Sequence, residues 1–231
     1  KLPVEVDIAS EFRYRNALVD GNTLVIIISQ SGETLDTFAA LKDAKAKGAR
    51  ILSIVNVVGS SIARESHDVL YTWAGPEIAV ASTKAYTTQI IALYEIALHM
   101  ADLKGTLSKE AIKAIKDEML ILPNKIEEAL KNKEEMQKFA TKYSGVKNVF
   151  FIGRGLDNAV ALEGSLKIKE ISYIHSDAYA AGELKHGPIA LIEKGTIVVA
   201  LMTQHDLSEK MLSNVKEVKA RGAMVIAIVG E

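Results

Sequence analysis

A repeated pattern of apolar strand, helix and apolar strand most constrains the fold of this chain. Apolar runs at 23–28 and 51–55 enclose a helical stretch, and runs at 196–201 and 225–229 enclose another. Both helical stretches end in a basic segment closed by glycine, a common stop after the last helical turn. Short β-branched runs joined through a helix are typical of parallel strands buried on both faces. The sequence therefore predicts two doubly wound α/β domains.

The repeat also predicts the domain boundaries. We expect a first domain over 1–106, a charged and amphipathic helical linker over 107–143, with a second amphipathic stretch after Pro123, and a second domain over 144–231. In the second copy a further apolar run, 148–152, precedes the repeated unit, and its counterpart in the first copy would lie upstream of Lys1. The second copy also stops where the first continues. We therefore expect both domains to be truncated.

Composition excludes several classes of partner. The 231 residues carry 28 Lys and Arg against 29 Asp and Glu, so there is no basic surface of the kind that nucleic acids or anionic membranes require. The most apolar helical stretch, 90–101, is interrupted by Glu95 and His99 and is too short to span a bilayer. Without cysteine there is no disulfide or thiolate metal site. The spacing typical of metal ligands is also lacking at His67, His99, His175 and His205. We expect a cytoplasmic protein without a metal.

The turn at 29–34, Ser-Gln-Ser-Gly-Glu-Thr, carries the clearest chemical signal. It joins the end of a predicted strand to the start of a helix, where free backbone N–H groups and the helix dipole favour an anion. Serine and threonine are also ordinary helix caps. The matching turn of the second copy, 202–207, has a different sequence, so the fold does not require these hydroxyls. With no Walker lysine and no Gly-x-Gly-x-x-Gly motif, the turn predicts a phosphorylated small molecule as ligand.

Three further segments hold polar groups whose sequence patterns are less specific. Ser82 and Thr83 open a long helix, where they either cap it or add a hydroxyl to the same crevice. Lys167 and Glu170 share one helical face, which is typical of a solvated ion pair. His186 follows before a Gly-Pro pair that predicts an exposed loop. A carboxylate and an imidazole would suit proton transfer next to a carbonyl carbon.

Four motifs in this order resemble one family over essentially the whole chain. They are the turn at 29–34, Val-Ala-Ser-Thr-Lys at 80–84, Glu-Gly-Ser-Leu-Lys-Ile-Lys-Glu at 163–170 and Ala-Ala-Gly-Glu-Leu-Lys-His-Gly-Pro at 180–188. Together they resemble the isomerase half of the glutamine:fructose-6-phosphate amidotransferases, the glucosamine-6-phosphate synthase family. The resemblance implies two sugar isomerase (SIS) domains, each a flavodoxin-like three-layer αβα sandwich with a mostly parallel sheet.

The resemblance also implies a reaction and a site. Fructose 6-phosphate and ammonia would become glucosamine 6-phosphate without a cofactor or metal. Glu170 would move the proton between C1 and C2 beside Lys167, and His186, contributed across a homodimer interface, would open the sugar ring. The expected sugar-phosphate ligands are Ser29, Gln30, Ser31, Thr34, Val80 and Ser82.

The sequence departs from this family in ways that affect activity. The glutaminase domain with its nucleophilic cysteine is absent, as are an upstream Ser/Thr-rich loop and the carboxyl-terminal lysine of the family's Schiff base. We therefore expect a fragment that binds sugar phosphate with little or no turnover. Two other interpretations stay open: an SIS-type glucosamine-6-phosphate deaminase, and a non-catalytic sugar-phosphate-binding SIS regulator. A regulator would have no use for Glu170 and His186.

Overall fold

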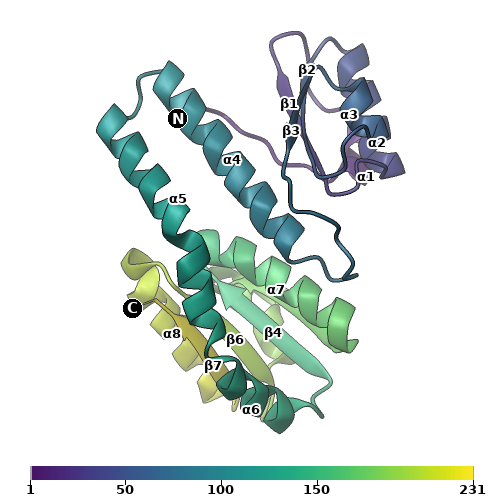
Figure 1. Ribbon diagram of the computed structural model, residues 1–231. Helices are drawn as coiled ribbons and strands as arrows, with labels where there is room; N and C mark the ends of the chain where they lie inside the picture. Colours follow the sequence, from purple (N-terminus) through teal and green to yellow (C-terminus); the bar gives the residue numbers. More distant parts are fainter. Residues whose placement is uncertain (1, 231) are drawn as a thin grey trace. The chain divides into compact units, whose positions relative to one another are not determined.

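A computed structural model describes residues 2–230 (Figure 1). The chain divides into two compact units, Lys1–Ile126 (unit 1) and Glu127–Glu231 (unit 2). The division falls inside the segment 107–143 that was expected to link the domains. Each unit is an α/β structure, and within the described residues every strand pair is parallel.

Unit 1 contains a three-stranded sheet in the order β1-β2-β3. Leu24 of β1 pairs with Arg50 of β2, and Leu52 of β2 pairs with Asp68 of β3. The helix between each pair of strands returns the chain to the same end of the sheet, as parallel pairing requires. Its elements are α1 (Ala9–Phe12), β1 (Leu24–Ser29), α2 (Leu35–Ala46), β2 (Arg50–Val55), α3 (Ser61–Glu65), β3 (Asp68–Tyr71) and α4 (Lys84–Leu103).

Unit 2 contains a four-stranded sheet in the order β5-β4-β6-β7. The chain passes from β4 to β5 on one side and then crosses to β6 on the other, so the strand order reverses beside β4. Its elements are α6 (Lys133–Tyr143), β4 (Asn148–Gly153), α7 (Leu156–Ser172), β5 (His175–Ala180), the 3-10 helices η1 (Ala181–His186), η2 (Pro188–Leu191) and η3 (His205–Leu207), β6 (Ile197–Met202), α8 (Ser208–Ala220) and β7 (Met224–Val229).

The predicted duplication is confirmed in the two βαβ units, β1-α2-β2 and β6-α8-β7. Both helices end at a glycine with φ of 91°, Gly48 and Gly222. In each, the next N–H group bonds back five residues, from Ala49 to Ala44 and from Ala223 to Val218. This is the Schellman arrangement, which needs a left-handed residue and therefore favours glycine.

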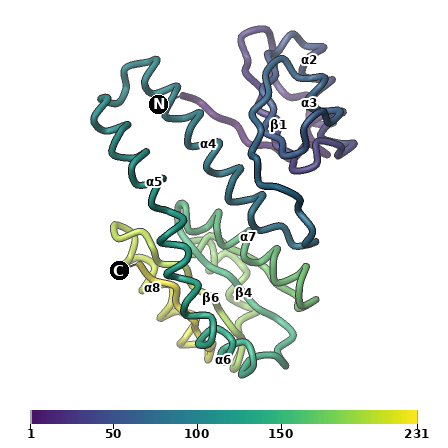
Figure 2. Tube along the Cα trace, in the orientation of Figure 1, coloured from purple at the N-terminus to yellow at the C-terminus, as the bar shows by residue number. Residues whose placement is uncertain are grey.

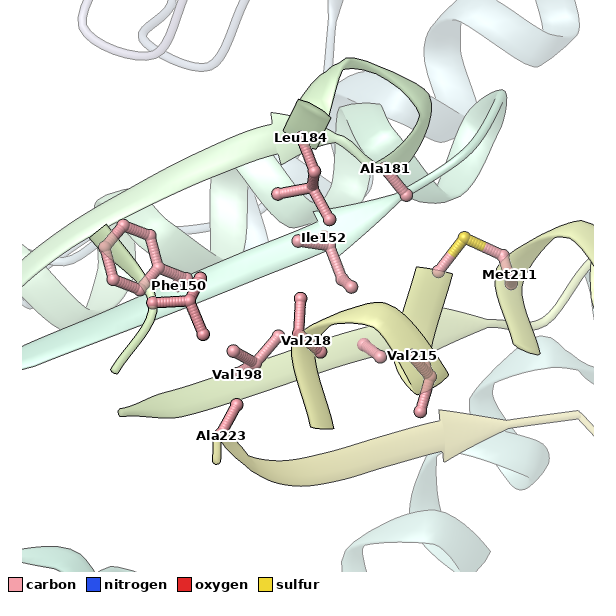
Figure 3. Packing of buried hydrophobic residues seen from close by; sticks show 11 residues of the cluster. Phe150, Ile152, Ala181, Leu184, Val198, Met211, Val215, Val218 and Ala223 are labelled. Atoms are coloured by element: carbon pink, nitrogen blue, oxygen red, sulfur yellow. The ribbon is translucent and has the colours of Figure 1, made fainter. Parts of the chain in front are cut away.

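The central strands of the unit 2 sheet, β4 and β6, are buried on both faces, as their continuous apolar sequences predict. The side chains of β4 alternate: Phe150 and Ile152 belong to the core beneath α8 (Figure 3), and Phe151 belongs to the core beneath α7. The α8 side chains Met211 and Val218 complete the first core, and both are fully buried or nearly so. Helices on both faces of a parallel sheet make the three-layer sandwich that the sequence predicts.

The core of unit 1 lies between its sheet and the helices α2 and α3. Ile51 and Val55 of β2 are fully buried there with Leu41 of α2 and Ile62 of α3. Burying such an aliphatic side chain contributes about 1.5–3 kcal/mol. This packing holds the carboxyl ends of β1 and β2 against the start of α3, next to the turn at 29–34.

The helical segment after α4 differs from the prediction at Pro123. One helix, α5 (Lys109–Leu130), includes that residue, and its trace is labelled in Figure 2. The interruption comes at Lys131 and Asn132, before α6. Pro123 is exposed, and water can bond the carbonyl that a proline leaves unpaired in a surface helix. Within residues 2–230 no helix is both long and apolar enough to span a membrane.

Candidate functional site

The turn at 29–34 lies at the carboxyl edge of the unit 1 sheet. Ser29 is the last residue of β1 and is buried, and α2 begins at Leu35. Gly32 has φ of 67°, a left-handed conformation that reverses the chain within the turn. The turn therefore ends at a helix N-terminus, where backbone N–H groups lack partners within the helix.

The hydroxyl groups of this turn converge on one another. Ser29 Oγ accepts a hydrogen bond from the Gly32 N–H at 3.1 Å and lies 3.4 Å from Thr34 Oγ1. Ser31 Oγ accepts from the Glu33 N–H at 3.2 Å. A hydroxyl that accepts one bond still has a proton to donate. The turn is thus a small concentration of O–H and N–H donors, which is what a phosphate oxygen requires.

The structure does not show these hydroxyls acting as helix caps. Thr34 occupies the N-cap position of α2 but makes no side-chain capping bond. The bonds of Ser29 and Ser31 stay within the turn, at Gly32 and Glu33. Capping therefore does not account for the hydroxyls of this turn.

Gln30 is fixed through a neighbouring residue that the sequence analysis did not single out. The backbone oxygen of Gln30 accepts a bond from the Asn56 N–H at 3.1 Å. The Asn56 side chain in turn accepts from Thr72 and from the Ala74 N–H, at 3.1 and 2.8 Å, and donates to the Gly75 oxygen at 2.7 Å. A lone asparagine after a strand carries no sequence signal for such a role.

Val80 and Ser82 are not brought to the turn by any hydrogen bond within residues 2–230. Val80 is 91% exposed. Ser82 Oγ donates to Glu77 Oε2 at 2.9 Å, and the same carboxylate oxygen accepts from the Ala85 N–H at 3.3 Å. Thr83, at the N-cap position, makes no side-chain capping bond. The cap of α4 is therefore Glu77, a residue that sequence analysis missed.

A charged cluster lies on α7 in unit 2. Lys167 Nζ lies 2.7 Å from Glu170 Oε2 and 3.4 Å from Glu163 Oε1, and the three side chains are 20–29% exposed. Burial alone would lower the pKa of Lys167, but the hydrogen bond to Glu170 and the charge of Glu163 outweigh it and raise that pKa above its usual value. Lys167 is therefore a permanent cation between two carboxylates.

In the part of the chain that the structure describes, no hydrogen bond or ion pair joins His186 to this cluster. It ends the 3-10 helix η1, before Gly187 and Pro188, where the sequence predicts an exposed loop. Its side chain is 74% exposed, and Nε2 is 3.9 Å from Glu183 Oε2. The structure thus leaves this imidazole open to a ligand or partner. Within residues 2–230 no group of His, Asp or Glu side chains is arranged to hold a metal ion.

The fold and these groups place the chain in a defined class. The SIS domain family model matches residues 1–99 and 142–231, and the chain belongs to that family. The expected pair of SIS domains is thereby confirmed.

Individual proteins with high sequence identity to this chain narrow the comparison within the SIS family. The chain is 64% identical over 231 residues to the glutamine--fructose-6-phosphate aminotransferase of Clostridium tetani. The match covers all of this chain and 38% of that protein. It is 66% identical over 227 residues to the enzyme of the same name from Caldanaerobacter subterraneus, covering 98% of this chain and 37% of that protein. The chain thus spans less than two fifths of these relatives.

Two solved structures superimpose on this chain. The C-terminal domain of glucosamine-fructose-6-phosphate aminotransferase from Francisella tularensis superimposes with a TM-score of 0.96 at 44% identity, covering 99% of this chain and 65% of that one. A glucosamine-6-phosphate deaminase from Thermotoga maritima superimposes with a TM-score of 0.68 at 24% identity, over 95% of this chain and 65% of that one, which shows a shared fold alone.

Proposed function

We propose that this chain is the sugar-phosphate isomerase part of a glutamine--fructose-6-phosphate aminotransferase. In the parent protein this part binds fructose 6-phosphate and, with ammonia released from glutamine elsewhere in that protein, forms glucosamine 6-phosphate and water. The chain by itself binds the sugar phosphate with little or no turnover. The observation that carries the proposal is the hydroxyl cluster of the turn at 29–34, whose Ser29, Ser31 and Thr34 are not spent on capping α2. The names of relatives more than 60% identical support the choice of substrate.

Binding of the phosphate is assigned to the turn at 29–34, with Val80 and Ser82 as further contacts with the sugar. The hydroxyls and N–H groups supply donors without a fixed positive charge, and the phosphate provides binding energy remote from the reacting carbons. Such energy positions the C1–C2 end of the sugar for reaction.

Proton transfer is assigned to Glu170. One carboxylate within reach of two adjacent carbons can remove a proton from one and return it to the other. Lys167, held as a cation 2.7 Å from Glu170, orients that carboxylate and can stabilise the oxyanion that develops on the sugar. His186 is the proposed acid–base group for ring opening. Its 74% exposed side chain supports a role at a homodimer interface, supplied to the second copy.

The proposal also includes the direction of the reaction and the cellular compartment. A deaminase would use the same groups in reverse, but the close relatives named as aminotransferases favour synthesis. A regulator without catalysis would not need the Lys167–Glu170 pair. The cysteine-free composition suits the reducing cytoplasm, where we place the protein. A coupled assay on the full-length parent, run in both directions with and without glutamine, distinguishes synthase from deaminase.

The binding proposal is tested by titrating fructose 6-phosphate into the wild-type chain and into Ser31→Ala/Thr34→Ala by calorimetry. Loss of two charge-assisted hydrogen bonds should weaken binding by about 3 kcal/mol, roughly a hundredfold. The matched control is Ser66→Ala/Thr87→Ala, because these hydroxyls donate to backbone oxygens of their own helices. The control should bind as wild type, and equal binding by all three proteins would remove the turn from the site.

A further inference from the structure

Glu33 is the one charged side chain of the turn at 29–34, and the proposed function gives it no role. It lies between the proposed phosphate ligands Ser31 and Thr34. A carboxylate close to a bound phosphate repels it. Unless Glu33 is engaged elsewhere, its presence in this turn would oppose binding.

The structure shows where this carboxylate is engaged. Glu33 Oε1 accepts a hydrogen bond from the backbone N–H of Ser61, 28 residues further along the chain, at 2.8 Å. One residue earlier, the backbone oxygen of Gly32 accepts from the Ile62 N–H at 3.0 Å. Two successive residues of the turn are therefore tied to two successive residues at the start of α3.

The same region packs tightly against the turn. A β-carbon added at Gly32 would lie 2.1 Å from Ser60 Oγ, and Ser60 is only 2% exposed. The segment 60–62 thus contacts the turn through close packing and through both hydrogen bonds. The turn cannot shift toward α3, and Glu33 and Gly32 keep it from moving away.

The charge of Glu33 is compensated on the side of α3. Hydrogen bonding from Ser61, by its hydroxyl and then its backbone N–H, is the main reason that the pKa of Glu33 is lowered, and the charge of Arg64 adds to the effect. Arg64 is itself held by the oxygen of Gly59 and by Ser61 Oγ, the latter at 3.3 Å. The carboxylate is therefore ionised and directed at its own partners.

We propose that Glu33 is a positioning residue, which ties the turn at 29–34 to the start of α3 so that the hydroxyls of Ser31 and Thr34 stay arranged for a phosphate. The inference rests on the proposed phosphate site. It assigns Glu33 an indirect part in binding, through the Ser61 N–H, and no contact with the ligand.

Two substitutions at Glu33 separate this role from simple charge repulsion. Glu33→Gln keeps an oxygen that accepts the Ser61 N–H, whereas Glu33→Ala has none. With inorganic phosphate and with fructose 6-phosphate, calorimetry should show about tenfold weaker binding by Glu33→Ala and binding by Glu33→Gln within about twofold of wild type. Tighter binding by both variants would show that the carboxylate only repels the ligand, and unchanged binding by Glu33→Ala would show that it positions nothing; either overturns the proposal.

A second pair of variants tests the same tie from α3. Ser61→Pro removes the N–H donor, and proline suits this position because Ser61 is the first residue of α3 and Ser60 before it is extended, with ψ of 162°. Its matched control, Ser61→Ala, loses the hydroxyl but keeps the N–H. Ser61→Pro should lose affinity as Glu33→Ala does, the two losses should not add in the double variant, and Ser61→Ala should bind within about threefold of wild type.

The outcomes also separate this inference from the function on which it rests. If the wild-type chain binds neither probe, the proposed phosphate site fails and the role of Glu33 fails with it. If wild type binds and Ser61→Pro binds equally well, the site stands and only the positioning role is overturned. Far-ultraviolet circular dichroism on every variant shows that the fold is retained, and Ser61→Pro decides the matter should Glu33→Ala fail to fold.

Discussion

Gly32 shows how a single residue shapes the proposed site. Its φ of 67° turns the chain between two hydroxyl-bearing residues, and its missing side chain leaves room for Ser60. Either requirement alone would favour glycine. Together they mean that any other residue would both strain the backbone and displace the segment against which the turn is packed.

Substitution of Gly32 by alanine should therefore cost more stability than the same change at a comparable glycine. Gly59 is the matched control, because its φ is 72° but an added β-carbon would meet nothing within 4 Å. Urea unfolding should give a loss of about 1 kcal/mol for Gly59→Ala and about 2–4 kcal/mol for Gly32→Ala. Adding Ser60→Gly should recover part of the second loss. Equal losses at the two glycines would show that packing against Ser60 is unimportant.

The candidate residues differ in how far the sequence could predict them. The sequence indicates the turn at 29–34 as a candidate anion site because it places Ser, Gly and Thr between a strand and a helix. The sequence does not indicate Asn56 or Glu77. Asn56 bonds to Gln30, and Glu77 caps α4, only after the chain has folded. Such long-range roles depend on which loops meet and leave no local pattern.

The elements were predictable where apolar periodicity and glycine act together. Both βαβ units follow the sequence closely, because each pairs β-branched strands with a Gly-stopped helix. Pro123 was misleading for a physical reason: a proline breaks a buried helix more readily than an exposed one, and no residue of α5 is buried. The 3-10 turns around His186 were predicted only as a loop, since Gly-Pro marks an interruption without specifying its geometry.

Helix α7 is anchored by a buried carboxylate that the motif analysis passed over. Asp157, in its first turn, is only 4% exposed and accepts hydrogen bonds from the Thr203 N–H at 2.8 Å and from Thr203 Oγ1 at 2.5 Å. These bonds join the start of α7 to the residue that follows β6. An acidic residue in the first turn of a helix also interacts favourably with the helix dipole, which supports the helix.

Asp157→Ala should destabilise the protein by about 2–3 kcal/mol, because it leaves both Thr203 donors without their acceptor. Asp206→Ala is the control in the same unit, since Asp206 is exposed, and it should change stability by less than about 0.5 kcal/mol. Urea unfolding measures both. A loss below about 1 kcal/mol for Asp157→Ala would mean that water replaces the carboxylate at little cost.

At the scale of the whole molecule, the chain uses one fold twice with different chemistry at equivalent turns. The turn at 29–34 starts at the last residue of β1, and its counterpart, 202–207, starts at the last residue of β6. In unit 2 the Thr203 donors are bonded to Asp157, and Gln204 Nε2 donates to the backbone oxygen of Arg154 at 2.6 Å. In unit 1 the Ser31 hydroxyl, which only accepts a bond, still has a proton to donate to an anion, whereas in unit 2 the Thr203 and Gln204 donors are already bonded within the protein.

This difference predicts one phosphate site per chain despite the duplication. Calorimetry with inorganic phosphate should give a stoichiometry of one, and Ser31→Ala/Thr34→Ala should remove that binding as a whole instead of halving it. Gln204→Ala, which alters the equivalent turn of unit 2, should leave the affinity unchanged. Two sites in the wild type, or one surviving in Ser31→Ala/Thr34→Ala, would show that the turn after β6 binds anions as well. The internal hydrogen bonds of Asp157 and Gln204 would then have to give way to the ligand, at a cost of about 1–3 kcal/mol for each group left unpaired.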